Sequence, residues 1–234
     1  MGADTPNFGH GTRSARWNRA GAIGGLIAAI LLAVTMVLLS SLPTADSPGR
    51  IVAADLQARY ATAMAASFAG VFSSVALAPL VASFRAFAPP SDDEAEWRWT
   101  VTLLSAAAAV SLMLAGSALL AAAAILADQT AAVSALFAGA KTCLTFALTP
   151  AGVLIVANAR TLSSSRTPTR WLIKIDLEIG ILAIASSATI LLHGDWFGAG
   201  EQLVAGAGLL VALWEATIAL VILEGGGAAG CDPA

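Results

Sequence analysis

Long apolar runs separated by short polar segments constrain the fold of this chain more than any other feature. A helix rises 1.5 Å per residue and therefore needs about 20 residues to cross the roughly 30 Å hydrocarbon layer of a membrane. Six runs of this length are present, and we expect each to form one transmembrane helix. They lie at residues 20–42, 61–84, 99–127, 131–158, 171–193 and 203–223.

The composition indicates the same class of protein. Hydrophobic residues make up 58% of the chain and charged residues 12%, whereas a soluble domain has about a quarter of its residues charged. Such a chain cannot cover itself with polar surface, so its apolar side chains must face lipid. We therefore predict an all-α, polytopic integral membrane protein with six transmembrane helices. Its parts are a cytoplasmic N-terminal segment at 1–19, a six-helix transmembrane domain at 20–223 and a flexible cytoplasmic tail at 224–234.

The distribution of lysine and arginine predicts the orientation, because loops on the cytoplasmic side of a membrane carry an excess of these residues. With the N-terminus inside, nine of the 12 basic residues fall in inner segments, and only Arg50 and Arg59 in outer ones. Both termini are then cytoplasmic, and we expect a multi-pass protein of the bacterial plasma membrane. The inner residues are Arg13, Arg16, Arg19, Arg85, Arg98, Arg160, Arg166, Arg170 and Lys174.

Several local features shape this expectation. The first run follows three arginines, as a signal peptide does, but it is too long and lacks a clear cleavage site, so an uncleaved anchor is favoured. Residues 42–50 contain two prolines and a glycine and predict a turn-rich segment after the first run. Residues 128–130 separate the third and fourth runs and predict a helical hairpin. Pro79 and Pro150 lie inside runs and predict kinks.

Lys141 and Glu215 are the charged residues expected deepest in the membrane. Each lies ten to twelve residues into its run, counted from the outer side, which places both at about 15–18 Å depth. A charge at that depth costs about 2.5–3.5 kcal/mol on insertion scales and usually finds a partner in the bundle. The sequence therefore predicts that the two side chains form an ion pair. A structural role is favoured over a proton or ion relay, or a pocket for a ligand head group.

Hydroxyl and acidic residues near these positions are secondary candidates. Thr145 and Thr149 share a helical stripe with Lys141. Asp176 and Glu178 open the fifth run, where Glu178 is spaced to pair with Lys174. Asp176 points to nearly the opposite side, so it needs another partner or a neutral, protonated state. We favour the interpretation that it reaches water at the membrane interface.

Other function classes lack their sequence signals. No basic cluster interleaved with aromatics could follow a nucleic acid backbone, so we expect no nucleic acid partner. The only histidines, His10 and His193, lie outside run interiors, which excludes haem held by two buried histidines. Cys143 and Cys231 have no neighbours at metal-ligand spacing. We expect no metal, cofactor or catalytic residue, because no catalytic or nucleotide-binding motif is present.

Three short stretches resemble the DUF4386 proteins, an uncharacterised bacterial membrane family. They are residues 80–85 (LVASFR), residues 167–172 (TPTRWL) with Gly180 following, and residues 213–220 (LWEATIAL), which hold Glu215. Thr169 between Pro168 and Arg170 departs from the family's pattern. The resemblance implies a six-helix membrane protein with a glutamate in its last helix, and it implies no catalytic residue.

Two functions follow as hypotheses. The first is a non-enzymatic accessory or structural subunit of a membrane assembly, in contact with lipids and with other membrane subunits or further copies of itself. The alternative is a small transporter or a lipid- or small-molecule-binding protein that uses a polar site at Lys141 and Glu215. A membrane enzyme comes third, and its catalytic group would have to be Asp176, Glu178 or Glu215.

Overall fold

The computed structural model describes residues 10–84, 93–163, 170–188 and 197–228. These residues form eight α-helices and no strand, which confirms the predicted all-α class. The helices are α1 (His10–Ser40), α2 (Gly49–Ala58), α3 (Tyr60–Phe84), α4 (Asp93–Ile125), α5 (Thr130–Phe146), α6 (Leu148–Ser163), α7 (Arg170–Ser187) and α8 (Phe197–Ala228).

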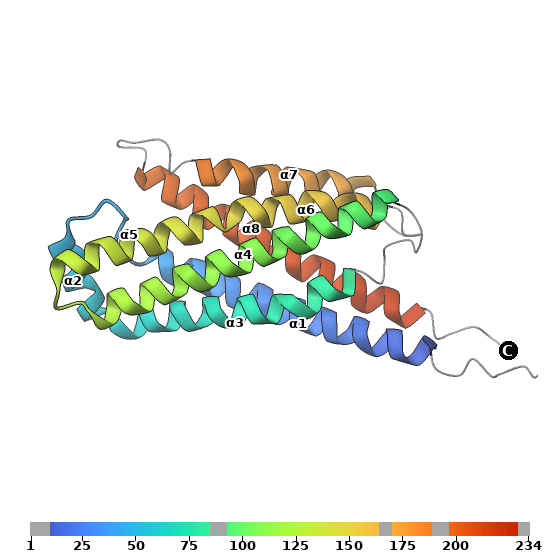
Figure 1. The fold of residues 1–234 in the computed structure, drawn as a ribbon, viewed down its shortest axis with the longest axis horizontal. Helices are drawn as coiled ribbons and strands as arrows, with labels where there is room; N and C mark the ends of the chain where they lie inside the picture. The colour runs from blue at the N-terminus through green and yellow to red at the C-terminus, as the bar shows by residue number, and fades with distance from the viewer. Residues whose placement is uncertain (1–9, 85–92, 164–169, 189–196, 229–234) are drawn as a thin grey trace, which may run out of the picture.

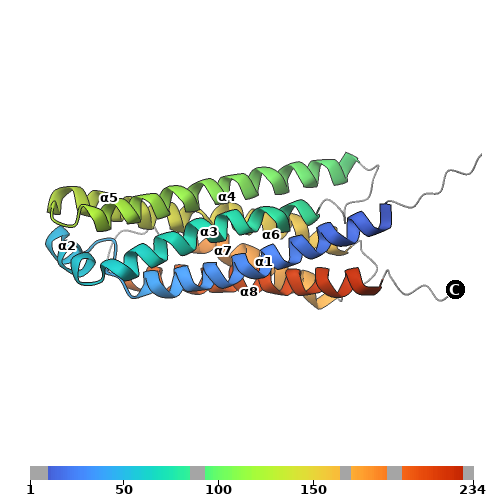
Figure 2. The ribbon, with the colours of Figure 1, turned by 90° about the horizontal axis from the view of Figure 1, so that it is seen from below.

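The helices form an elongated bundle in which all except α2 run roughly along the long axis (Figures 1 and 2). α1 packs against α3 and α8, while α6 packs against α4 and α7. The chain reverses direction at each connection between long helices, with α5 and α6 forming one pass. As a result, the first residues of α1 and the last residues of α8 lie at the same end of the bundle (Figure 1).

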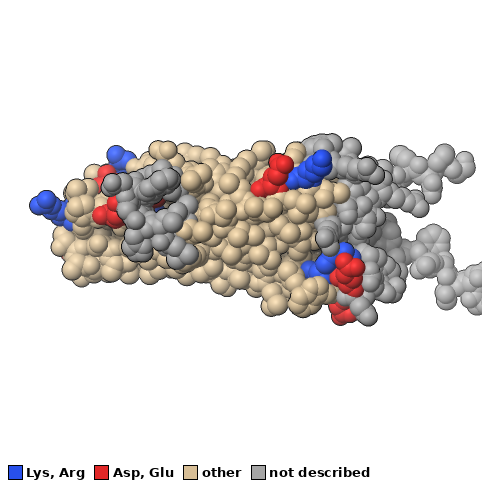
Figure 3. All heavy atoms as spheres, turned by 90° about the horizontal axis from the view of Figure 1, so that it is seen from above, with Lys and Arg blue, Asp and Glu red and all other residues tan. Residues whose placement is uncertain are grey.

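Five helical segments are long and apolar enough to cross a membrane, and α5 and α6 count together as one of them. Charged side chains gather toward the two ends of the face drawn in Figure 3, with an uncharged belt between them. This distribution fits a bundle whose middle lies in lipid. The five segments are Trp17–Ser40, Tyr60–Phe84, Glu96–Ile125, Thr130–Ala159 and Glu201–Glu224. They correspond to five of the six predicted runs.

The run predicted at 171–193 is not among these five segments. Its described part, α7, carries Arg170, Lys174, Asp176 and Glu178 within 18 residues, and residues 189–193 lie outside the described part. The described residues therefore give five candidate crossings, and the sixth predicted crossing is not confirmed. The reason is the charge density of the first half of α7, where four of the first nine residues are charged.

Helix α2 corrects the prediction for the segment after the first run. Residues 42–48 are irregular, as expected, but Gly49–Ala58 then form a short helix that was not predicted. Its buried residues Val52, Ala53 and Leu56 share one face. Gln57 donates from Nε2 to the backbone oxygen of Ala127 at 3.0 Å, so α2 is tied to the α4–α5 turn at this end of the bundle.

The predicted hairpin between the third and fourth runs is confirmed, with a turn between α4 and α5 at which Asp128 is exposed. The predicted effect of Pro150 is also found, because the helix is interrupted at Ala147 between α5 and α6. Pro150 has no N–H group to donate to the carbonyl of Phe146. In contrast, α3 continues through Pro79 as one helix.

Candidate functional site

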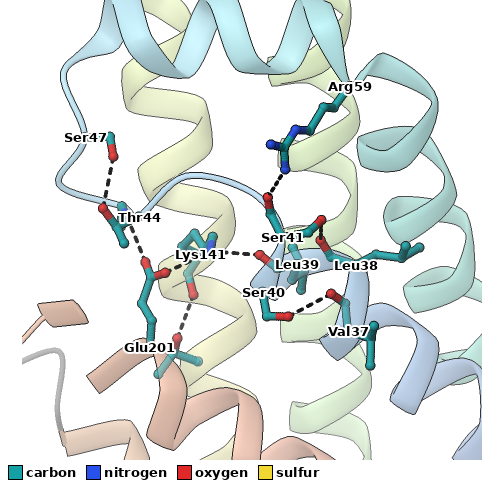
Figure 4. Close-up of polar contacts among 12 residues, drawn as sticks. Val37, Leu38, Leu39, Ser40, Ser41, Thr44, Ser47, Arg59, Lys141 and Glu201 are labelled. Carbon is teal, nitrogen blue, oxygen red and sulfur yellow. Dashed lines mark hydrogen bonds and ion pairs between the residues drawn. The ribbon is translucent and has the colours of Figure 1, made fainter. Parts of the chain in front are cut away.

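An ion pair between Lys141 and Glu201 is the most connected polar feature of the described structure. Lys141 Nζ lies 3.2 Å from Glu201 Oε2, and the two side chains come from α5 and from the second turn of α8 (Figure 4). Both are largely shielded, with exposed fractions of 13% and 24%. An ion pair in such surroundings is less screened than a pair on an open surface.

Both partners of this pair also bind backbone groups of the segment that ends α1. Lys141 Nζ donates to the carbonyl of Leu39 at 3.3 Å, in the last turn of α1, where the helix dipole favours a cation. Glu201 Oε1 accepts the N–H of Ala45 at 2.8 Å. The ammonium group also lies 5.5 Å from the centre of the Phe137 ring, within cation–π range. The pair therefore joins α1, the α1–α2 segment, α5 and α8.

The prediction that Lys141 pairs with Glu215 is wrong. Glu215 lies 14 residues after Glu201 on the same helix, a separation of about 21 Å along its axis. The predicted depths assumed that each apolar run begins at the same level. In the structure, the start of α5 packs against α2 instead: a side chain added at Gly49 would come 2.9 Å from the carbonyl of Thr130. Lys141 therefore lies level with the end of α1.

Glu201 was missed because it lies outside the six apolar runs, two residues before the sixth. One signal could have identified it. Glu201 is the acidic residue nearest to the outer end of that run, whereas Glu215 is near its middle. The short turn before the fourth run places Lys141 near the same outer end, where Glu201 is closer to it than Glu215.

Glu215 lies apart from this network, in the middle of α8. Its exposed fraction is 5%, and its Oε2 atom is buried with no hydrogen-bond partner in the described part of the chain. Ala219, one turn further on α8, would be 3.1 Å from a side chain added at Gly25 of α1, and Gly208 lies against Met36 of α1. These neighbours share a stripe of α8 with Glu215, so the carboxyl group faces the α1–α8 interface.

Asp176 is a second buried acid, with an exposed fraction of 2%. It faces the indole of Trp214 on α8, although Trp214 Nε1 lies outside hydrogen-bonding geometry. Lys174 and Glu178 are exposed, so the predicted opposite orientation of Asp176 is confirmed. The expectation that Asp176 reaches outward to water is wrong, because this side chain packs inward. Lys174 and Glu178 form no ion pair within the described structure, although their spacing would allow one.

Thr145 and Thr149 are both used in helix packing. Thr145 Oγ1 donates to the carbonyl of Lys141 at 2.9 Å, one turn earlier on α5. The hydroxyl groups of Thr149 and Ser187 lie 2.6 Å apart and join α6 to α7. Neither threonine joins Lys141 to Glu215. The two residues therefore stabilise the helices that carry the candidate site rather than extending it.

The described residues contain no group of three or more His, Cys, Asp or Glu side chains that could hold a metal ion. Their polar groups form one inter-helix ion pair near one end of the bundle and two separate buried acids, Asp176 and Glu215. Together with the five candidate spans, they define an all-helical membrane protein with few charged groups in its interior.

Comparisons with protein-family models, with curated proteins and with solved structures found no match. The resemblance to the DUF4386 proteins is therefore neither supported nor contradicted, and it stays a prediction.

Proposed function

We propose that this chain is a non-enzymatic accessory or structural subunit of an assembly in the bacterial plasma membrane. The observation that carries the proposal is the network around Lys141, in which one ion pair fixes α1, α5 and α8 relative to one another. Such a network holds a helical scaffold in one arrangement and engages two of the three N–H donors of the lysine.

We further propose that the chain crosses the membrane six times and has both termini in the cytoplasm. The sixth crossing would be α7, which packs against α6 and α8 as a member of the bundle. Its charged residues fall in its first nine positions, and Lys174 and Glu178 are exposed there. Side chains of this length near a helix end can reach the head-group region. The excess of basic residues at this end supports the cytoplasmic assignment.

The outward face of α4 supports a role in an assembly. α4 is the least buried of the five candidate spans. Its exposed surface carries a series of small side chains, and small residues let membrane helices approach closely. Lipids cover such a face in a monomer, and another subunit or a second copy would cover it in an assembly. The small exposed residues are Ala107, Ala108, Ser111, Ala115 and Ala118.

Isolation of the full chain from native membranes in a mild detergent tests this proposal. We expect it to copurify with a membrane protein or with further copies of itself. Ala115→Leu should weaken that association without changing the melting temperature, because Ala115 is exposed on α4. Val221→Leu, at a half-exposed position on α8, serves as the matched control. A monodisperse monomer without a partner would contradict the proposal.

The alternative function, a small transporter or a lipid- or small-molecule-binding protein, required Lys141 and Glu215 to line one polar site. Lys141 is held by Glu201 instead, about 21 Å from Glu215 along α8. The arrangement of Lys141 therefore does not favour this function. A pH-dependent flux in proteoliposomes that disappears in Glu215→Gln would restore it, with Glu215 acting alone.

A further inference from the structure

Glu215 is the polar side chain that the proposed function does not use. It lies near the middle of a candidate membrane span, and it is almost fully enclosed. Its Oε2 atom has no hydrogen-bond donor within reach in the described structure. A structural carboxylate at such a depth normally has a cation or several donors around it. The surroundings of Glu215 therefore need an explanation of their own.

No basic side chain among the described residues faces Glu215 from the helices packed around it. In α1, the described side chains from 17 to 40 include one ionisable residue, Arg19, which is exposed and lies beyond Gly25 toward the N-terminus. The described side chains of α6, from 148 to 159, include none. In α3, whose Phe84 packs against Trp214, the only ionisable residue is Tyr60, at the opposite end of that helix. In α7, Lys174 and Glu178 are exposed, and Asp176 faces Trp214. On α8 itself, Glu201 is paired with Lys141 and Glu224 is exposed.

The packing of α1 against α8 leaves little room for water to solvate an ionised carboxylate. Ala219 approaches Gly25, and Gly208 approaches Met36 so closely that an added side chain would come 2.6 Å from the Met36 sulfur. Glu215 lies between these two contacts. A charge here would have to be hydrated by separating the helices, whereas a neutral carboxylic acid fits the interface as it is.

We propose that Glu215 is a proton-binding site at the interface between α1 and α8, and that loss of its proton at alkaline pH weakens this interface. This inference goes beyond the structural role proposed above, because it gives the scaffold a group that responds to proton concentration. It requires no ion pair and no other residue of the network around Lys141.

Infrared spectroscopy of the purified full chain tests the protonation directly. At neutral pH we expect a carbonyl stretch from a neutral carboxylic acid, which shifts in deuterated water and shifts again when glutamate is labelled with ¹³C at its side-chain carboxyl. The band should be absent from Glu215→Gln. It should remain in Glu201→Gln and Asp176→Asn, which are matched controls for a paired and a second buried acid.

Thermal unfolding tests the consequence for the interface. Between pH 7 and pH 10 we expect the melting temperature of the wild type to fall more than that of Glu215→Gln, because glutamine cannot acquire a charge. The infrared test of protonation does not depend on whether the variant folds, because it can be read from the labelled wild-type spectrum alone. A labelled glutamate band present only as carboxylate at neutral pH would overturn the proposal. Equal pH dependence of the two melting temperatures would overturn the proposed weakening of the interface.

Discussion

Lys141 Nζ and Glu201 Oε2 lie 3.2 Å apart, at the point where the end of α1 meets α5 and the start of α8. The same carboxylate accepts the N–H of Ala45, and the same ammonium group binds the carbonyl of Leu39. Each partner thus adds a hydrogen bond to a backbone group, and the Leu39 carbonyl accepts from Leu42 N–H as well as from Lys141. Removing either side chain therefore breaks a hydrogen bond to the backbone as well as the ion pair.

Lys141→Met should destabilise the protein by about 1–2 kcal/mol, because this partly shielded pair falls between exposed pairs and fully buried ones. The variant removes the cation beside Glu201 and the donor to Leu39. Unfolding of the purified chain in mixed detergent micelles measures the effect. Glu94→Gln breaks the exposed pair with Arg98 and is the control, with an expected change below about 0.5 kcal/mol. Equal stability of Lys141→Met and the wild type would contradict a stabilising role for the ion pair between Lys141 and Glu201.

Double-mutant cycles should couple Lys141 to Glu201 and not to Glu215. In the first cycle, Lys141→Met and Glu201→Leu together should cost less than the sum of the single changes by about 1 kcal/mol, because the second change removes an acid that the first leaves unpaired. In the second cycle, Lys141→Met and Glu215→Leu should be additive within about 0.5 kcal/mol, as expected of distant sites. A larger coupling in the second cycle would support the pairing inferred from the sequence.

Gly152→Ala should destabilise the contact between α6 and α7. A side chain at Gly152 would collide with the carbonyl oxygen of Gly180 and come 2.7 Å from Ile184 Cγ1. We expect a loss of about 1–3 kcal/mol, as for other overpacked sites. Gly206 is the matched control, because a side chain there meets nothing within 4 Å.

Gly206→Ala should stabilise α8 by about 0.5–1 kcal/mol, through the higher helix propensity of alanine. Melting temperatures of the two variants give the comparison. If both glycine variants changed the melting temperature in the same direction, the close approach of α6 and α7 would not be the cause.

The sequence was sufficient to predict the helical class, five of the spans and the α4–α5 hairpin, because hydrophobic run length reports directly on lipid-facing helices. It also predicted the break before Pro150, which follows from the missing N–H group of proline. α7 was harder to predict, since this helix contains four charged residues whose cost depends on which face they occupy. Asp176 is buried there, while Lys174 and Glu178 are exposed.

The partner of Lys141 could not be predicted because it depends on the relative axial positions of four segments. Hydropathy fixes where a run starts in the sequence but not how far each helix extends beyond its neighbours. Here α2, a short helix with only three buried residues, packs against the start of α5 and sets that offset. The isolated position of Glu215 follows from the same offset, since the lysine expected to neutralise it lies at the end of the bundle.

The proposed six crossings predict where single cysteines can be labelled in intact cells by a reagent that does not cross the membrane. A cysteine at position 46, between α1 and α2, should be labelled, because that end of the bundle would be extracellular. A cysteine at position 165, between α6 and α7, should be labelled only after the membrane is opened, since its segment carries much of the excess positive charge.

Epitope tags at the two ends separate six crossings from five. An even number of crossings puts both tags on one side, so we expect both to be protected from protease in intact cells and cleaved in opened ones. With α7 lying on the membrane surface, the connection from α7 to α8 would stay inside, α8 would cross outward and the C-terminal tag would be cleaved in intact cells. Labelling of position 165 from outside would contradict the orientation itself, because the bundle would then be inserted with its basic end outward.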